Sequence, residues 1–269
     1  MNYYDQVLDN INNLNENDLQ FFFESNTEYI PTPYIQNHGI HFNAILTKFP
    51  ISSSYICDFA YITKSTVEWE IVFIEIESPQ KRIFLKNDKD IRFSSEFNNA
   101  CDQVLSWKAF IGSNFEFVKN SLRTLLRPAQ MYNNQVRFKY VLLLGRNSEL
   151  KTQQHINMFR NRQSNDFKIL TYDSISNYNV FNRLSTKHII LAKEKEQYRL
   201  KNLDTFSTNI FAYLNSSELI IDKLKIDTLR NNDFEIDKWI QGEYLTINDR
   251  YAESSMERIF SSMANNTQK

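Results

Sequence analysis

Two glutamates lie within the otherwise apolar run at positions 71–80, IVFIEIESPQ. Successive side chains of a β-strand point to opposite faces, so Glu75 and Glu77 share one face with Phe73. Pro79 then ends the strand, because it has no backbone N–H to donate to a neighbouring strand. One solvated face of a sheet would explain both glutamates without any chemistry. The alternative is that they belong to a polar site.

A third carboxylate, Asp58, lies in the preceding strand-like segment at residues 55–63, YICDFAYIT. If the four residues KSTV connect the two strands as a hairpin, Thr63 pairs with Glu68 and Asp58 pairs with Phe73. This register places Asp58 on the face that carries the two glutamates. A connection one residue longer or shorter would place it on the reverse face.

Three ionised carboxylates at such short range repel one another unless protons or a cation intervene. Mg²⁺ prefers oxygen ligands, often one or two carboxylates, with positions left for water and phosphate. The sequence therefore predicts a Mg²⁺ (or Mn²⁺) site at Asp58 and Glu75, with the solvated sheet face as the alternative.

The bulk composition is that of a globular protein. The chain has 269 residues, of which 42% are hydrophobic and 14% aromatic, with only 4 glycines and 5 prolines, so it can bury a large core. No run approaches the ~20 apolar residues of a membrane span, and the first residues lack the pattern of a secretion signal. Two cysteines without C-x-x-C spacing favour a reducing compartment. We therefore expect a soluble, cytoplasmic protein with no membrane partner.

Hydrophobic periodicity predicts an α/β domain with a mixed sheet. The order is helix, strand, strand, helix, strand, helix, strand, and Asn17 or Asp18 can cap the first helix. One stripe of the second helix carries Phe97, Ala100, Cys101, Val104 and Leu105. The corresponding segments are 15–31, 55–63, 68–78, 93–112, 137–146, 148–163 and 167–175. A loop at 30–42 follows the first helix.

The character of the chain changes near residue 186. Residues 188–203 are typical of a charged hairpin or an edge strand, and residues 206–232 of helix. We therefore predict two parts, a domain at 1–185 and a mainly helical extension at 186–269 that could serve oligomerisation.

The carboxylate pattern resembles that of PD-(D/E)XK nucleases, in which a strand aspartate precedes E-x-(K/E) on the next strand and a helix that bears glutamine. The helix segment from Gln103 to Trp107, QVLSW, is similar to the Q-x-x-x-Y motif of RecB-like nucleases. FIEIESPQKRIF, FNNACDQVLSW, VLLLGRN and FKILTYDSI resemble, in this order, four motifs of the Shedu anti-phage nucleases. The resemblance covers about residues 16 to 180.

This resemblance implies a restriction-endonuclease-like core and a Mg²⁺-dependent DNA endonuclease that acts as a homo-oligomer, a dimer or tetramer, in defence against phage. Asp58, Glu75 and the Ile76 carbonyl would hold the metal, and Gln103 would hold the attacking water or a phosphate oxygen. Glu77 departs from the family, which usually has lysine there.

A glutamate supplies no positive charge, but Glu77 could bind a second metal ion or accept a proton from the water. Lys81 or Arg82 could deliver the cation from a displaced position. The alternative is a degenerate member that binds DNA or senses its ends without cleaving it.

Other residues have a functional and an ordinary interpretation. Glu16 or Glu24 could be the carboxylate that this superfamily often has on its first helix, and Arg146 could contact phosphate or another subunit. For Trp107, packing in the protein core is the preferred interpretation over stacking on a nucleic-acid base. A locally basic stretch could follow a DNA backbone or be a solvated face; it consists of Arg123, Arg127, Arg137 and Lys139. The two histidines His38 and His41 do not have the spacing of a zinc site.

Overall fold

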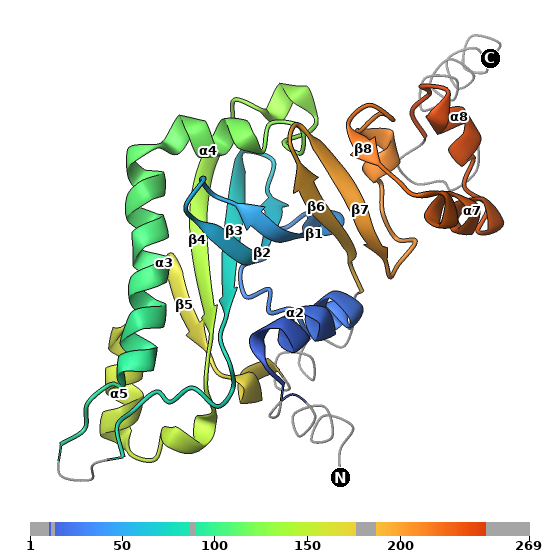
Figure 1. Ribbon diagram of the computed structural model, residues 1–269. Helices are drawn as coiled ribbons and strands as arrows, with labels where there is room; N and C mark the ends of the chain where they lie inside the picture. The colour runs from blue at the N-terminus through green and yellow to red at the C-terminus, as the bar shows by residue number, and fades with distance from the viewer. Residues whose placement is uncertain (1–10, 12–13, 87–89, 176–186, 246–269) are drawn as a thin grey trace, which may run out of the picture.

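The computed structural model describes residues 11, 14–86, 90–175 and 187–245, and shows an α/β fold built on an eight-stranded mixed sheet flanked by helices (Figure 1). The strand order is β5-β4-β3-β2-β1-β6-β7-β8. The strands are β1 (Ile40–Pro50), β2 (Ile56–Lys64), β3 (Glu68–Ile76), β4 (Gln135–Leu143), β5 (Phe167–Leu170), β6 (Ile189–Glu194), β7 (Gln197–Leu203) and β8 (Leu219–Ile220). The helices are α2 (Glu16–Ser25), α3 (Ser95–Ser113), α4 (Phe115–Ser121), α5 (Gln153–Asn161), α7 (Lys223–Asn231) and α8 (Ile236–Ile240).

The sheet combines antiparallel and parallel pairs, which confirms the predicted mixed α/β class. β1, β2 and β3 form an antiparallel meander, and β4 and β5 then add to β3 in parallel. β6 pairs in parallel with β1 on the other side, and β7 continues as its antiparallel neighbour. The meander is therefore central, with strands on both sides of it.

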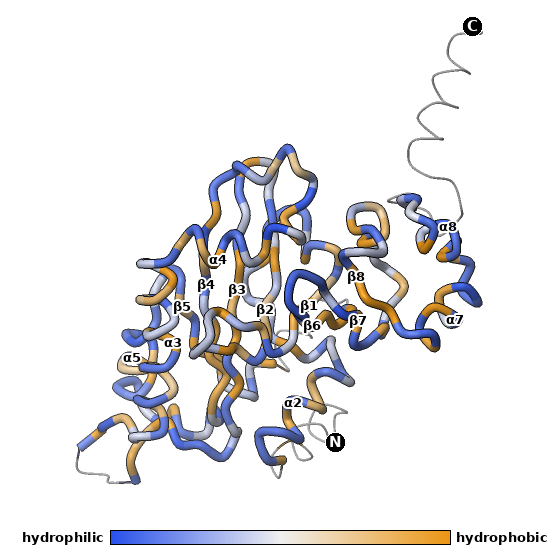
Figure 2. The backbone as a smooth tube through the Cα atoms, turned by 45° about the horizontal axis from the view of Figure 1, so that its top comes forward, coloured by the Kyte–Doolittle hydropathy of each residue, from blue (hydrophilic) through white to orange (hydrophobic). Residues whose placement is uncertain are grey.

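The helices cover the two faces of the sheet and close two cores. Residues of α3 pack in the core on one face, and residues of α2 pack in the core on the other. Figure 2 shows hydrophobic stretches along the central strands β3 and β4. Within the described residues, no helix has the length and apolar character that crossing a bilayer requires.

Strand β1 was not predicted, and the predicted loop at 30–42 overlaps its first residues. Phe42, Asn43 and Lys48 all have positive φ, and the register with β2 shifts between Ile40 and Ile45. These left-handed residues break the strict alternation of apolar and polar side chains by which a strand is recognised.

The hairpin of β2 and β3 has a register two residues away from the predicted one. Thr63 lies opposite Glu70, not Glu68, and Lys64 pairs with Trp69. A shift of two residues keeps every side chain on its predicted face, because the side-chain period of a strand is two. Extension of this register places Asp58 opposite Glu75 and not opposite Phe73.

The cap of helix α2 lies two or three residues earlier than predicted, and the helix ends sooner. The Asn15 side chain accepts a hydrogen bond from the Asp18 N–H, so Asn15 is the cap and the prediction of Asn17 or Asp18 was wrong. The helix ends at Ser25. Leu19 and Phe23 are its buried apolar residues.

The buried stripe of α3 is slightly rotated from the predicted one. Phe97, Ala100, Cys101 and Val104 are buried as expected, but Leu105 is 42% exposed. The stripe continues instead through Trp107 and Ile111. Trp107 is almost fully covered, so it packs in the core and offers no face for base stacking.

The two sides of α3 predict a matched pair of stabilities. Ile111→Ala should lower the free energy of unfolding by about 2–5 kcal/mol, because it removes methylene groups from a closed core and leaves a cavity. Leu105→Ala should cost less than about 1 kcal/mol. Urea unfolding followed by circular dichroism measures both, and equal losses would contradict the observed orientation of the helix.

The chain beyond residue 186 joins the same sheet. The predicted hairpin at 188–203 is confirmed as β6 and β7, and β8 pairs with β7. The predicted helix at 206–232 was wrong for its first part, which contains a short 3-10 turn at Ile210–Ala212 and strand β8. Helix α7 occupies the last part of that segment, and α8 follows it. The predicted boundary at residue 185 lies outside the described residues.

Candidate active site

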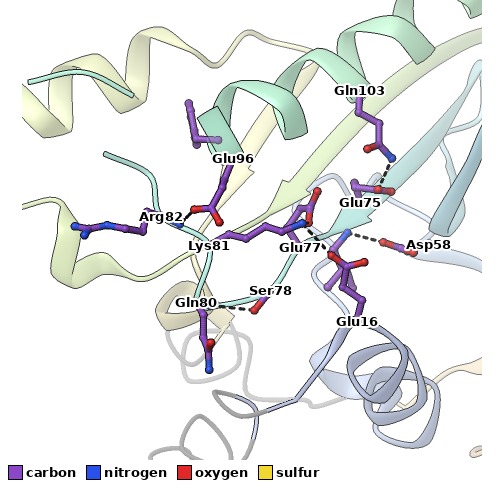
Figure 3. Close-up of polar contacts among 12 residues, drawn as sticks. Glu16, Asp58, Glu75, Glu77, Ser78, Gln80, Lys81, Arg82, Glu96 and Gln103 are labelled. Atoms are coloured by element: carbon purple, nitrogen blue, oxygen red, sulfur yellow. Dashed lines mark hydrogen bonds and ion pairs between the residues drawn. The ribbon is translucent and has the colours of Figure 1, made fainter. Parts of the chain in front are cut away.

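A polar cleft opens at the end of the sheet where β2 and β3 stop pairing. The last paired residues are Phe59 and Ile74, although both strands continue beyond this pair. The cleft has a volume of about 470 Å³ and lies where α2, the ends of β1–β3 and α3 meet (Figure 3). Its lining residues are Glu16, Asn17, Gln20, Lys48, Ile56, Asp58, Glu75, Ile76, Glu77, Lys81 and Gln103.

Asp58 is held at the fork between β2 and β3. Its Oδ2 accepts a hydrogen bond of 2.7 Å from the Ile76 N–H, which the divergence of the strands leaves without a ladder partner. Its Oδ1 forms an ion pair with the Lys48 ammonium at 2.5 Å. The side chain of Asp58 is only 15% exposed. Both carboxylate oxygens therefore have fixed partners.

Glu75 is the most deeply buried carboxylate of the cleft. Its Oε1 accepts a hydrogen bond of 2.5 Å from Gln103 Nε2, which α3 directs toward it (Figure 3). Its Oε2 is buried and has no hydrogen-bond partner among the described residues. Burial raises the pKa of Glu75 to about 9, and the negative charges of Asp58 and Glu77 act in the same direction. Without a cation, Glu75 is therefore protonated at neutral pH.

Glu77 and Glu16 share one lysine. The Lys81 ammonium pairs with the Glu77 carboxylate and lies 2.9 Å from Glu16 Oε1 (Figure 3). Partial burial raises the pKa of Glu77, although Lys81 opposes this effect. Burial also disfavours the charged lysine, but the contacts with both glutamates outweigh it and raise the pKa of Lys81.

The cleft contains more acid than base. It is lined by four carboxylates and two ammonium groups, so its formal charge is −2 when all of them are ionised. One divalent cation, or two protons, would neutralise this charge. Burial is the main cause of the raised pKa values of Glu75 and Glu77, and the neighbouring carboxylates add to it.

A comparison with protein families identifies the chain. The family model of the Shedu protein SduA, C-terminal, matches residues 13–175, which is more than half of the chain. The chain belongs to the Shedu family. The match spans every residue that lines the cleft and associates the chain with anti-phage defence. A comparison with curated proteins finds no match.

The structure brings together the residues that were predicted to form the catalytic and metal site. Asp58, Glu75, Glu77 and Gln103 line this one cleft, together with Ile76. It also distinguishes between the two carboxylates of the first helix that the sequence left as alternatives. Glu16 lies in the cleft, whereas the Glu24 carboxylate is bound by Lys201, Thr47 and Gln20.

The sequence also left Lys81 and Arg82 as alternatives for the displaced cation. Lys81 lies in the cleft. Arg82 is absent from the lining, its guanidinium lies 3.7 Å from Glu149, and its backbone N–H donates to Glu96. Of the two candidates for a displaced cation, Lys81 is therefore the one that lines the cleft.

Sequence reasoning missed three polar lining residues, namely Lys48, Asn17 and Gln20. Lys48 belongs to β1, the strand that was not predicted. Asn17 and Gln20 project from α2 beside Glu16, at the i+1 and i+4 positions. Recognition of Glu16 as the cleft carboxylate would have drawn attention to Gln20, because residues four apart share one helix face.

The other candidate cations have partners outside the cleft. Arg146 forms a bidentate contact with Asp173 at 2.9–3.1 Å. The cations of the predicted basic stretch also have partners. These contacts are Arg127 with Glu218, Arg137 with Glu68, Lys139 with Glu70, and Arg123 over the ring of Tyr132.

His41 has a structural role. Its ring is buried and its Nε2 lies 3.0 Å from the Leu125 carbonyl oxygen. Burial lowers the pKa of His41 to about 3, so the ring is neutral.

The cleft offers oxygen donors of the kind that Mg²⁺ prefers. Among the described residues, no group of three or more His, Cys, Asp or Glu side chains is arranged to hold a metal ion. Two carboxylates face one another across the fork, and one oxygen, Glu75 Oε2, has no partner. Mg²⁺ is commonly bound by one or two carboxylates together with water and substrate phosphate. The donor set of the chain meets that requirement.

The protonated state of Glu75 predicts an effect on stability. The folded protein holds this proton up to about pH 9, whereas an unfolded chain releases it near pH 4.3. Between these values the unfolded state binds fewer protons, so stability contributed by neutral Glu75 is full below about pH 4 and falls as the pH rises. Glu75→Gln, which mimics the neutral form, should therefore be more stable than the wild type at pH 8.5.

Thermal melts in EDTA measure this difference at two pH values. A gain of about 1 kcal/mol corresponds to about 2–4 °C in Tm for a chain of this size. The gain should shrink toward zero at pH 5. An equal Tm difference at both pH values would show that Glu75 ionises without cost.

Proposed function

We propose that the protein is a Mg²⁺-dependent DNA endonuclease that hydrolyses phosphodiester bonds in Shedu-type defence against phage. The observation that carries this proposal is the unpartnered, buried Glu75 Oε2, which lies in the same cleft as Asp58. A carboxylate oxygen buried without a partner is costly, and proteins retain such groups mainly where a ligand or a reaction uses them.

Asp58 and Glu75 would hold the metal ion, with the Ile76 carbonyl as the third oxygen. Mn²⁺ would serve in place of Mg²⁺. A bound Mg²⁺ supplies a Lewis acid that stabilises the negative charge developing on the phosphate. The hydrogen bond from Ile76 orients Asp58, and that from Gln103 orients Glu75, so both carboxylates are fixed before a metal arrives.

Glu77 and Lys81 would divide the work of the lysine found in other family members. Glu77 would accept a proton from the attacking water, because its raised pKa makes it a better base near neutral pH than an ordinary glutamate. The Lys81 ammonium, which touches Glu77, would supply the positive charge beside the phosphate. Gln103 would bind the water or a phosphate oxygen in addition to Glu75.

The second candidate function is a non-cleaving protein that binds DNA or senses DNA ends, as a defence or assembly component. It is favoured by the glutamate at position 77 and by the engagement of both cleft lysines with carboxylates. The two functions share the fold and the DNA partner, but only the first needs the metal.

Incubation of supercoiled plasmid and linear DNA with Mg²⁺ or Mn²⁺ separates the two functions. We expect nicking or linearisation that EDTA abolishes. DNA binding in a gel-shift assay without metal-dependent cleavage would favour the second function. A crystal soaked with Mn²⁺ adds an independent test, because the anomalous peak should lie between Asp58 and Glu75.

We also propose a homo-oligomer, a dimer or tetramer, that acts in the cytoplasm. The resemblance to Shedu nucleases supports the oligomer, and the two free, buried cysteines fit a reducing compartment. Residues 186–269 would form an extension to the domain at 1–185 and contribute to assembly. Light scattering on the full chain and on a variant with altered surface residues of α7 tests this role.

A further inference from the structure

Lys48 is placed by an unusual backbone conformation. The pairs Thr47–Phe59 and Phe49–Cys57 set Lys48 directly across from Asp58 on the neighbouring strand. Its φ is +44°, the left-handed region, which a residue with a Cβ seldom adopts within a strand. Such conformations persist only where the surroundings impose them, and they are frequent at functional sites.

The neighbours of Lys48 impose this conformation. On one side, the Thr47 hydroxyl is bound by Gln20 and donates to Glu24. On the other side, Phe49 is fully buried in the core that contains α3. Its two neighbours are thus fixed on opposite faces of the sheet, and the Lys48 side chain reaches across to Asp58 on β2.

We propose that Lys48 is an internal substitute for the metal ion, which neutralises Asp58 until a divalent cation displaces it. This inference rests on the metal site of the proposed function. One oxygen of Asp58 already accepts a hydrogen bond from the Ile76 N–H, and its other oxygen forms the ion pair with the Lys48 ammonium. A cation shared with Glu75 must therefore take the oxygen that Lys48 occupies or repel the ammonium from beside it.

The two partners differ in how easily they can move. The side chain of Lys48 is 54% exposed, so its ammonium can turn into water at low cost. Asp58 is mostly covered and held by a backbone hydrogen bond, so it stays. Once released, the ammonium remains on the rim of the cleft, where a DNA phosphate would attract it.

Removal of the lysine charge should consequently strengthen metal binding. We expect Lys48→Met to lower the Kd for Mn²⁺ about tenfold in the absence of DNA, whereas Lys48→Arg should bind Mn²⁺ like the wild type. The matched control is Lys187→Met. Lys187 forms a comparable ion pair with Asp204, at 3.1 Å and 47% exposed, but outside the lining of the cleft.

Electron paramagnetic resonance of free Mn²⁺ measures these affinities with the full chain at pH 7.5, with thermal melts to confirm folding. Tighter binding for Lys48→Met alone, lost again in the double variant with Glu75→Ala, supports the inference. Equal or weaker binding for Lys48→Met overturns it but leaves the nuclease proposal intact. An absence of Mn²⁺ binding by the wild type and every variant overturns both.

Discussion

Glu75→Ala is expected to lower the rate of metal-dependent DNA cleavage at least about a thousandfold, which corresponds to about 4 kcal/mol of transition-state stabilisation. Glu75 is one of the two carboxylates proposed to hold the metal, and its Oε2 has no hydrogen-bond partner among the described residues that a metal ion would have to replace. Its loss also frees the Gln103 amide, which no longer has the carboxylate that orients it. The measurement is the initial rate of plasmid nicking with saturating Mg²⁺.

Two further variants separate loss of chemistry from loss of fold. Glu75→Gln should lose cleavage nearly as completely, yet be more stable than the wild type at pH 8.5, so unfolding cannot explain the loss. Glu70→Ala is the matched control, since Glu70 lies on the same strand, pairs with Lys139 and is outside the cleft. It should retain activity within about twofold. Substantial cleavage by Glu75→Ala would exclude this cleft as the active site.

Lys81→Met is expected to reduce cleavage about a hundredfold to a thousandfold, in the range found when one group that stabilises transition-state charge is removed. Lys81 is the cation that touches Glu77. Lys81→Arg should retain more activity because it keeps the charge. DNA binding at low salt should change much less than the cleavage rate, since one cation is only a small part of the backbone contacts.

Arg82→Met is the neighbouring control. Arg82 is next in the sequence and carries the same charge, but its guanidinium faces Glu149 and not the cleft. We expect its effect on the cleavage rate to be no more than a few fold. If Arg82→Met were the more damaging change, the displaced cation would have to be reassigned.

The sequence by itself determined which carboxylates share the site. The E-x-E spacing places Glu75 and Glu77 on one side of a strand, and the same period of two brings Asp58 to them even though the predicted register was wrong by two residues. The amphipathic pattern of α3 likewise orients Gln103, because helical spacing is a local property of the chain. These predictions depended on the side-chain period of strands and helices, which neighbouring residues encode.

Only the tertiary structure decided which cations and which helix carboxylate complete the cleft. Glu16 and Glu24 lie two turns apart on α2, and only docking of α2 against the sheet directs Glu16 to Lys81 and Glu24 to Lys201. Lys48 enters through a left-handed residue in a strand whose alternation is broken. Contacts between elements far apart in the chain create these placements, so no local pattern in the sequence encodes them.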